Sequence, residues 1–166
     1  MSELVFPSEE WIAKYREKVN EDEEYAEASE GWGVDFNGDF LFTVTDMPID
    51  ELDEDKLPEE LKEQLDKYVD GDTGYSLIGL EDGDCTRAEL ITDPDNYDYG
   101  FELKGPYENW KGLIRGEIDP IQGIMSGKFE LNGDMQKVMQ YNEGAQRLAS
   151  VSSQVGGVFA DEEYGK

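Results

Sequence analysis

Catalytic chemistry has few candidate side chains in this 166-residue sequence. There is no histidine, so neither a Ser-His-Asp triad nor a Cys-His nucleophile pair can form, and no imidazole can bind a metal. The single cysteine, Cys85, falls at a predicted turn-to-strand position without a candidate base beside it. Two carboxylates could act together in hydrolysis, but no spacing among the 41 Asp and Glu residues singles out a pair. We therefore predict that the chain is not an enzyme.

Phosphate and calcium sites are not indicated either. The glycines of Gly31–Gly33 open a predicted strand instead of a helix, which a dinucleotide-binding loop would require. The acidic turn Asp70–Asp72 has no acidic ligand at the fifth position of a calcium loop. The turn Asp93–Asp95 places Tyr97 fifth and Asp98 sixth, where such a loop needs glycine. We expect no metal and no cofactor.

The net charge of the chain limits its partners. There are 41 acidic and 14 basic residues, which gives a formal charge of −27. This charge repels nucleic acids and anionic membrane surfaces. It fits either an adaptation to multimolar salt or an acidic surface that mimics nucleic acid or docks a basic partner. Because the carboxylates are spread over predicted helices, turns and loops alike, we favour salt adaptation.

The charge is distributed unevenly along the chain. Residues 1–105 contain 32 acids and 8 bases, a net charge of −24, whereas residues 106–159 contain 6 acids and 5 bases, a net charge of −1. Gly144–Phe159 contains no acid at all. In so acidic a chain, this segment is either buried or faces something apolar.

A length of 166 residues suggests one domain over residues 1–166. A chain of this size buries roughly 70% of its unfolded surface, so it needs no disulfide or metal to fold. The lone cysteine fits a reducing compartment. The N-terminus lacks the basic start and apolar run of a signal peptide, and no apolar stretch approaches the ~20 residues of a membrane span. We expect a cytoplasmic protein without stable membrane insertion.

The helices that we predict combine an apolar stripe with suitable capping residues. Ser8 can cap the first of them, whose stripe includes Trp11 and Tyr15. Gly156 and Gly157 break the last one, and we expect residues 157–166 to fray. The predicted helical stretches are 9–19, Glu21–Ala28, Pro58–Tyr68, Pro106–Arg115, a short helix from Pro120, another from Met135, and Glu143–Val155.

Strands are predicted where polar and apolar residues alternate. Gly31–Thr45 suggests a hairpin because two alternating runs flank Asn37-Gly38, a tight-turn pair. Tyr75–Leu80 and Cys85–Thr92 suggest a second hairpin, and Tyr99–Leu103 a further strand. Between the two hairpins, residues 46–72 form an acidic insertion that contains one predicted helix.

The segment Asp119–Asp134 carries the strongest local pattern. Asp119 can cap a helix whose first position is Pro120, and Gly127 can end it in a left-handed conformation. Residues 128–131 alternate as a half-buried strand does, and Asn132-Gly133 turns the chain. Asp134 can cap the next helix.

The helix faces and the strand in residues 106–159 supply our candidate binding residues. Flexible methionines beside branched side chains suit an adaptable apolar surface, although each residue could equally fill a solid core. The candidate residues of this apolar surface are Trp110, Leu113, Ile114, Ile121, Ile124, Met125, Phe129, Leu131, Met135, Val138, Met139, Leu148, Val151 and Val155.

This order of elements resembles the sterol carrier protein type 2 family, and most closely its single-domain bacterial and archaeal branch. Asp119, Pro120, Met125, Gly127, Lys128, Gly133 and Asp134 match that family's D-P-x-x-x-x-M-x-G-K-x-x-x-x-G-D signature, with Phe129 and Leu131 inside it. The similarity spans about residues 8–155. Together with the acidity of the chain, it suggests a halophilic archaeal source.

The resemblance implies an α/β (α+β) fold with a twisted, largely antiparallel sheet of about five strands. Helices on one face would enclose an apolar tunnel that binds a lipid or an acyl or prenyl chain, with no catalytic step and no cofactor. The alternative is an acidic protein-interaction module with a closed core and no lipid ligand. The ligand's identity and the oligomeric state stay open.

Overall fold

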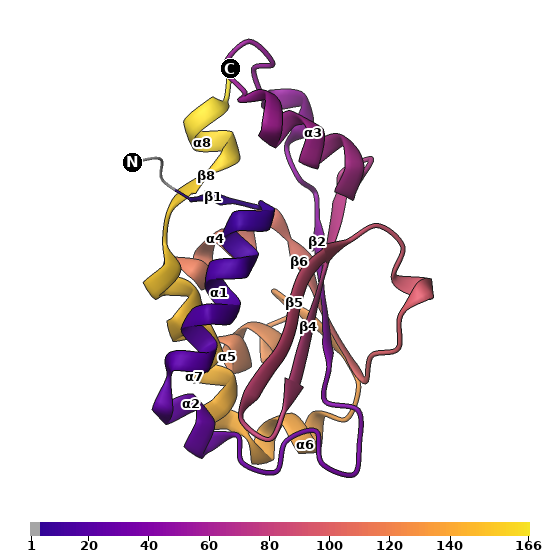
Figure 1. The fold of residues 1–166 in the computed structure, drawn as a ribbon, viewed down its shortest axis with the longest axis vertical. Helices are drawn as coiled ribbons and strands as arrows, with labels where there is room; N and C mark the ends of the chain where they lie inside the picture. Colours follow the sequence, from indigo (N-terminus) through magenta and orange to yellow (C-terminus); the bar gives the residue numbers. More distant parts are fainter. Residues whose placement is uncertain (1–3) are drawn as a thin grey trace.

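Residues 4–166 are described by a computed structural model, in which helices pack against one face of a twisted sheet (Figure 1). Helices α1, α2, α4, α5 and α7 lie on that face, and α3 and α8 lie at one end of the molecule. The helices are α1 Glu9–Glu21, α2 Glu23–Ala28, α3 Glu59–Tyr68, α4 Tyr107–Ile114, α5 Pro120–Met125, α6 Met135–Gln140, α7 Asn142–Val155 and α8 Ala160–Tyr164, with short 3-10 turns η1 Ile49–Glu51 and η2 Pro94–Asn96.

The main sheet has the strand order β3-β4-β2-β6-β7, and β5 shares with β3 the outer edge of β4. Only β2 and β6 run parallel, so the sheet is mostly antiparallel and the predicted fold class is confirmed. A separate parallel pair joins β1 to β8. The strands are β1 Val5–Phe6, β2 Phe40–Thr45, β3 Val69–Asp70, β4 Thr73–Glu81, β5 Asp84–Ile91, β6 Phe101–Pro106, β7 Glu130–Asn132 and β8 Val158–Phe159.

The predicted hairpin over Gly31–Thr45 is wrong, because only its second half forms a strand. Gly31, Gly33 and Asp35 have φ angles of 93°, 82° and 69°, which break an extended chain. The Trp32 indole nitrogen donates instead to the Gly38 carbonyl oxygen at 2.9 Å. Both edges of β2 are already paired, with β4 and with β6, so no edge is left for a second hairpin strand.

Local capping signals place α1, α5 and α6 as predicted, with Ser8, Asp119 and Asp134 as the capping residues. The Asp119 carboxylate accepts hydrogen bonds from the backbone N–H groups of Ile121 and Gln122 at 2.9 and 3.1 Å. Gly127 ends α5 with a φ of 83°. The following strand begins two residues later than expected, at Glu130, since Phe129 turns inward and packs over Gly105 and Gly123.

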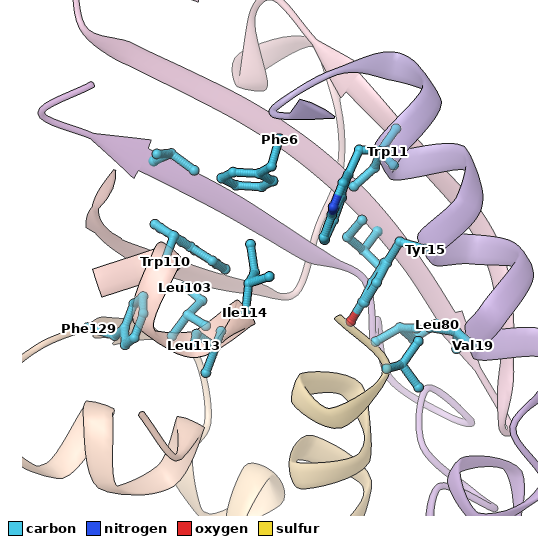
Figure 2. Close-up of a cluster of buried hydrophobic side chains, with 14 of the residues drawn as sticks. Phe6, Trp11, Tyr15, Val19, Leu80, Leu103, Trp110, Leu113, Ile114 and Phe129 are labelled. Atoms are coloured by element: carbon cyan, nitrogen blue, oxygen red, sulfur yellow. The ribbon is translucent and has the colours of Figure 1, made fainter. Parts of the chain in front are cut away.

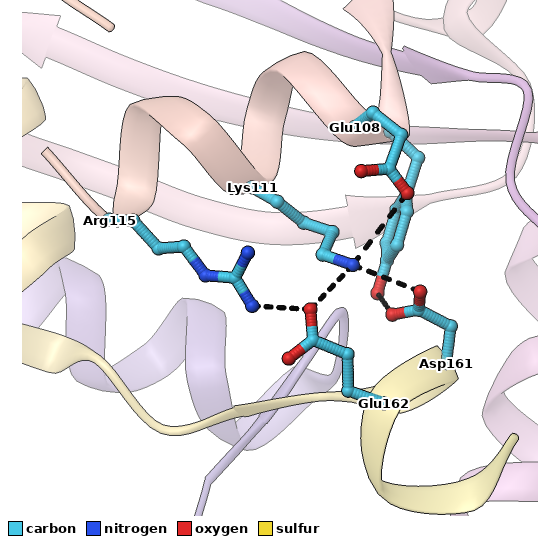
Figure 3. A network of polar contacts seen from close by, with 6 residues as sticks. Glu108, Lys111, Arg115, Asp161 and Glu162 are labelled. Atoms are coloured by element: carbon cyan, nitrogen blue, oxygen red, sulfur yellow. Dashed lines mark hydrogen bonds and ion pairs between the residues drawn. The ribbon is translucent and has the colours of Figure 1, made fainter. Parts of the chain in front are cut away.

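The tail is ordered, which corrects the expected fraying of residues 157–166. Val158 and Phe159 pair in parallel with β1, and the Phe159 side chain is buried. Lys111 of α4 is buried beneath α8, where its ammonium nitrogen lies 2.9 Å from an Asp161 oxygen and 2.7 Å from a Glu162 oxygen (Figure 3). Arg115 also pairs with Glu162. The sequence pattern missed this because the partners are 50 residues apart.

Candidate functional site

The main cavity lies between the inner face of the sheet and the helices. In Figure 2, Trp11 and Tyr15 of α1 point toward the side of the core that holds Ile114 and Leu113 of α4. The strands β2, β4 and β6 contribute the opposite wall. The lining residues are Phe6, Trp11, Ile12, Tyr15, Phe40, Phe42, Val44, Ser76, Leu103, Trp110, Leu113, Ile114, Pro120, Ile121, Ile124, Leu131, Val138, Ala145, Leu148, Ala149 and Ser152.

The volume of this cavity is about 80 Å³. On the same kind of measure, one water molecule needs only about 10–15 Å³. Ligand pockets are usually larger, roughly 300–1,000 Å³. The preformed space is therefore narrow, and a long chain would have to push its walls apart.

Most polar side-chain atoms in the wall donate hydrogen bonds to backbone carbonyl oxygens. Burial raises the pKa of Tyr15, so its hydroxyl stays neutral at ordinary pH. The bonds are Tyr15 Oη to the Leu148 carbonyl at 3.1 Å, Ser152 Oγ to that of Ala149 at 2.6 Å, Trp11 Nε1 to that of Gly156 at 2.9 Å, and Trp110 Nε1 to those of Thr43 and Gly105 at 3.2 and 3.1 Å.

Within residues 4–166, no charged side chain lines this cavity. Burying a charged group there would strip its water without providing a partner, which is strongly unfavourable. Burying a methylene group contributes about 0.8 kcal/mol. The wall therefore favours an aliphatic chain over any polar ligand.

Eight of the candidate residues lie in the cavity wall, although their contact with a lipid stays a prediction. They come from four helices and one strand, so the near-neutral segment does form one side of the cavity. They are Trp110, Leu113, Ile114, Ile121, Ile124, Leu131, Val138 and Leu148.

The other six candidates do not line this cavity. The prediction that all candidates form one wall is therefore corrected for these six. Phe129 is buried beneath α4 and α5, and Val151 is sealed inside the helix layer. Met125 and Met139 point outward, with exposed fractions of 68% and 44%. Met135 and Val155 are half-buried at the edge of the core.

Sequence reasoning missed the half of the wall that lies outside residues 106–159. We took candidate residues only from residues 106–159, but α1 and the inner sheet face also line the cavity. The sequence did indicate the apolar stripe of α1 and the alternation in β2. It did not indicate that these two elements line the same cavity. The missed residues are Phe6, Trp11, Ile12, Tyr15, Phe40, Phe42, Val44, Ser76 and Leu103.

Comparison with known families decides the assignment. Residues 50–146 match the model of the SCP-2 sterol transfer family. The chain belongs to this family. Membership implies lipid binding or transfer as the broad function of an SCP-2 domain, and the helix–strand corner at Asp119–Asp134 lies within the matched range.

Solved structures show the same fold. A crystal structure of sterol carrier protein 2 is 23% identical with a TM-score of 0.66, covering 90% of this chain and 98% of that one. A conserved hypothetical protein from Thermus thermophilus is 21% identical with a TM-score of 0.69, covering 93% and 92%. The sterol carrier protein domain 2 of Helicoverpa armigera is 16% identical with a TM-score of 0.52, covering 85% and 87%. No curated protein sequence matches the chain significantly.

None of the helices in residues 4–166 has both the length and the apolar character that crossing a bilayer requires. No group of three or more Cys, Asp or Glu side chains in this range is arranged to hold a metal ion.

Proposed function

We propose that this SCP-2 domain binds an apolar lipid, or an acyl or prenyl chain, in the cavity between sheet and helices, and releases it unchanged to an acceptor. One observation carries the proposal: the cavity wall is apolar and its Tyr, Trp and Ser152 polar atoms already have protein partners. The rival function, an acidic interaction module with a closed core, is not favoured because the helices leave space above the sheet.

The proposal includes no catalytic step, and the chemistry of the chain supports this. Cys85 is the only thiol in the sequence and is buried. Burial raises the pKa of this thiol to about 11, so it is a poor nucleophile at neutral pH. Its backbone is held by Asn20, whose amide oxygen accepts from the Cys85 N–H at 2.8 Å. We therefore assign Cys85 a packing role.

The binding test uses an uncharged long-chain alcohol or a prenyl alcohol. At a ligand concentration of about 100 Kd, binding stabilises the fold by about 2.7 kcal/mol. For a chain of this length that raises Tm by roughly 5–10 °C. Binding should also change the tryptophan fluorescence, since Trp110 lines the cavity.

A matched pair of variants on α5 separates cavity binding from surface adsorption. Ile124→Trp fills the cavity and should abolish the ligand-induced Tm shift, while overpacking lowers stability by only about 1–3 kcal/mol. Met125→Trp adds the same ring at the neighbouring, outward-facing position and should leave the shift intact. Equal ligand responses in both variants would contradict the proposed site.

We extend the proposal to a cytoplasm rich in salt, as in a halophilic archaeon. Residues 1–105 carry a net charge of −24, and this self-repulsion is screened by ions. Tm should rise markedly between dilute buffer and multimolar KCl, as followed by circular dichroism. Sucrose at matched osmolality serves as the control, because it stabilises by exclusion and screens nothing. A flat KCl profile would contradict salt adaptation and favour an acidic docking surface.

A further inference from the structure

A second, smaller cavity of about 30 Å³ adjoins the main one beneath α3. The two share Phe6, Trp11, Ile12, Val44 and Ser76 in their walls, so these side chains lie between the two cavities along the inner face of the sheet. Residues of α3 close the far end. A chain in the main cavity would enter the second one by displacing these shared side chains, just as it would push apart the walls of the main cavity.

The far end of the second cavity is polar, unlike the main cavity. Gln64 and Tyr68 of α3 line it and contact the first turn of α1. The Tyr68 hydroxyl donates to a Glu9 carboxylate oxygen at 2.9 Å, and the Gln64 amide nitrogen lies 3.4 Å from both Glu10 carboxylate oxygens. Two exposed carboxylates thus stand beside this end of the cavity.

Two backbone donors in the first turn of α1 are already used within the protein. The Glu9 N–H donates to the Gln64 side-chain oxygen at 2.8 Å, and the Trp11 N–H donates to Ser8 Oγ at 3.1 Å. No lysine or arginine lines the second cavity in residues 4–166. Lys67, whose ammonium nitrogen lies 4.9 Å from the Tyr68 ring centre, is exposed. The Glu9, Glu10 and Tyr68 oxygens are therefore the hydrogen-bond acceptors at this end.

We infer that this second cavity is an end-group subsite for a linear amphiphile whose end donates hydrogen bonds, a hydroxyl or an ammonium group. The aliphatic part would lie in the main cavity, and the donor would reach the Tyr68 and Glu9 oxygens. A carboxylate or phosphate end would instead meet two like charges. The inference rests on the proposed function and adds the chemical class of the ligand.

The experiment compares dodecylamine, dodecanol and dodecanoate, which share one chain length. Binding to the full chain is measured by titration calorimetry at pH 7 and about 0.1 M salt, where the Debye length is about 10 Å. Dodecylamine should bind about tenfold or more tightly than dodecanoate, since each nearby carboxylate attracts one and repels the other. Dodecanol, which carries no charge, reports chain binding and the hydrogen bond of its hydroxyl without the charge effect.

The decisive variant is the double substitution Glu9→Gln with Glu10→Gln, which keeps the oxygen acceptors and removes the charge. It should reduce the ratio of dodecanoate to dodecylamine dissociation constants by about tenfold. Glu23→Gln with Glu27→Gln is the matched control: it removes the same charge from exposed positions on α2 and should change the ratio less than about threefold. Tm without ligand checks that each variant folds.

Tyr68→Phe provides a second test that does not depend on charge. It removes the hydroxyl acceptor and keeps the ring, so dodecanol should bind several-fold more weakly. If the two double variants change the ratio equally and Tyr68→Phe binds dodecanol normally, the subsite is overturned while cavity binding stands. If wild-type protein binds none of the three amphiphiles, the proposed function and the subsite both fail.

Discussion

The two faces of strand β2 are covered very differently. Leu41 and Thr43 on the outer face are 1% and 2% exposed, although mainly a loop and its tyrosines cover them. On the inner face, under the layer of helices, Phe40 and Phe42 remain half-buried and line the cavity, whereas Val44 and Ile78 are 6% and 0% exposed. The difference between the two faces is therefore local. It marks where the cavity lies between the helix layer and the sheet.

Aromatic side chains provide a physical reason for the separation. At one end of the inner face, Trp110 packs against Phe42 and Phe129 with ring centres 5.1 Å apart in each pair. At the other end, Trp32 lies 5.0 Å from Phe101 and Phe40 lies 5.1 Å from it. Trp110 thus spaces α4 from the sheet at one end. At the other end the loop residue Trp32 packs on the sheet and, with ring centres 5.3 Å apart, on Tyr141 at the start of α7.

The contrast predicts a large difference between two Leu→Ala substitutions. Leu77→Ala on the outer face removes a fully buried side chain and should lower the free energy of unfolding by about 3–5 kcal/mol. Leu148→Ala in the cavity wall removes a half-buried one that already borders empty space, and should lower it by only about 1–2 kcal/mol. Urea denaturation measures both. Equal losses would mean that the inner face is packed as tightly as the outer.

A second prediction concerns the closed end of the inner face, where α1 meets β5. Arg16 Nε and Asn20 Nδ2 both donate to the Cys85 carbonyl, at 3.2 and 3.0 Å. Burial raises the pKa of the Cys85 thiol from 9.0 to about 11. Because the thiol ionises less readily in the folded protein than in the unfolded one, its contribution to the free energy of unfolding is fully present below pH 9. That contribution is lost as the pH rises to 11. The loss should be about 2–3 kcal/mol.

Urea midpoints measured between pH 8 and pH 11 test this in wild type and in Cys85→Ala. The variant should be less stable at pH 8 but should lose less stability from pH 9 to pH 11. Buried Tyr15 and Tyr107, whose pKa values burial also raises, extend the decline above pH 10 in both proteins. Parallel curves for the two proteins would show that the thiol is not the titrating group.

The sequence predicted the elements better than their mutual arrangement. Caps such as Asp119 and Asp134 act within three residues, so local patterns place them correctly. The hairpin expected from Asn37-Gly38 failed because its strand edge was taken by β6, some 60 residues later. The structure of the tail includes the ion pair between Lys111 and Asp161. These residues are 50 positions apart, so no local sequence pattern could predict the pair. Only one wall of the cavity was predicted, because that wall comes from a single near-neutral segment. The other wall comes from α1 and the sheet, which are distant in sequence.

The smallest expected effect concerns the candidates that face away from the cavity. Met139→Gln replaces a side chain that is 44% exposed and absent from the cavity wall. Substitutions at such surface positions change stability by about 0.5 kcal/mol or less. Val138→Ala, the neighbouring position on α6, is buried in the wall and should lower both stability and dodecanol affinity more. If Met139→Gln instead weakens dodecanol binding as much as Val138→Ala does, α6 must turn Met139 inward when ligand enters. The open inner face would then be a mobile wall and the closed outer face its fixed support.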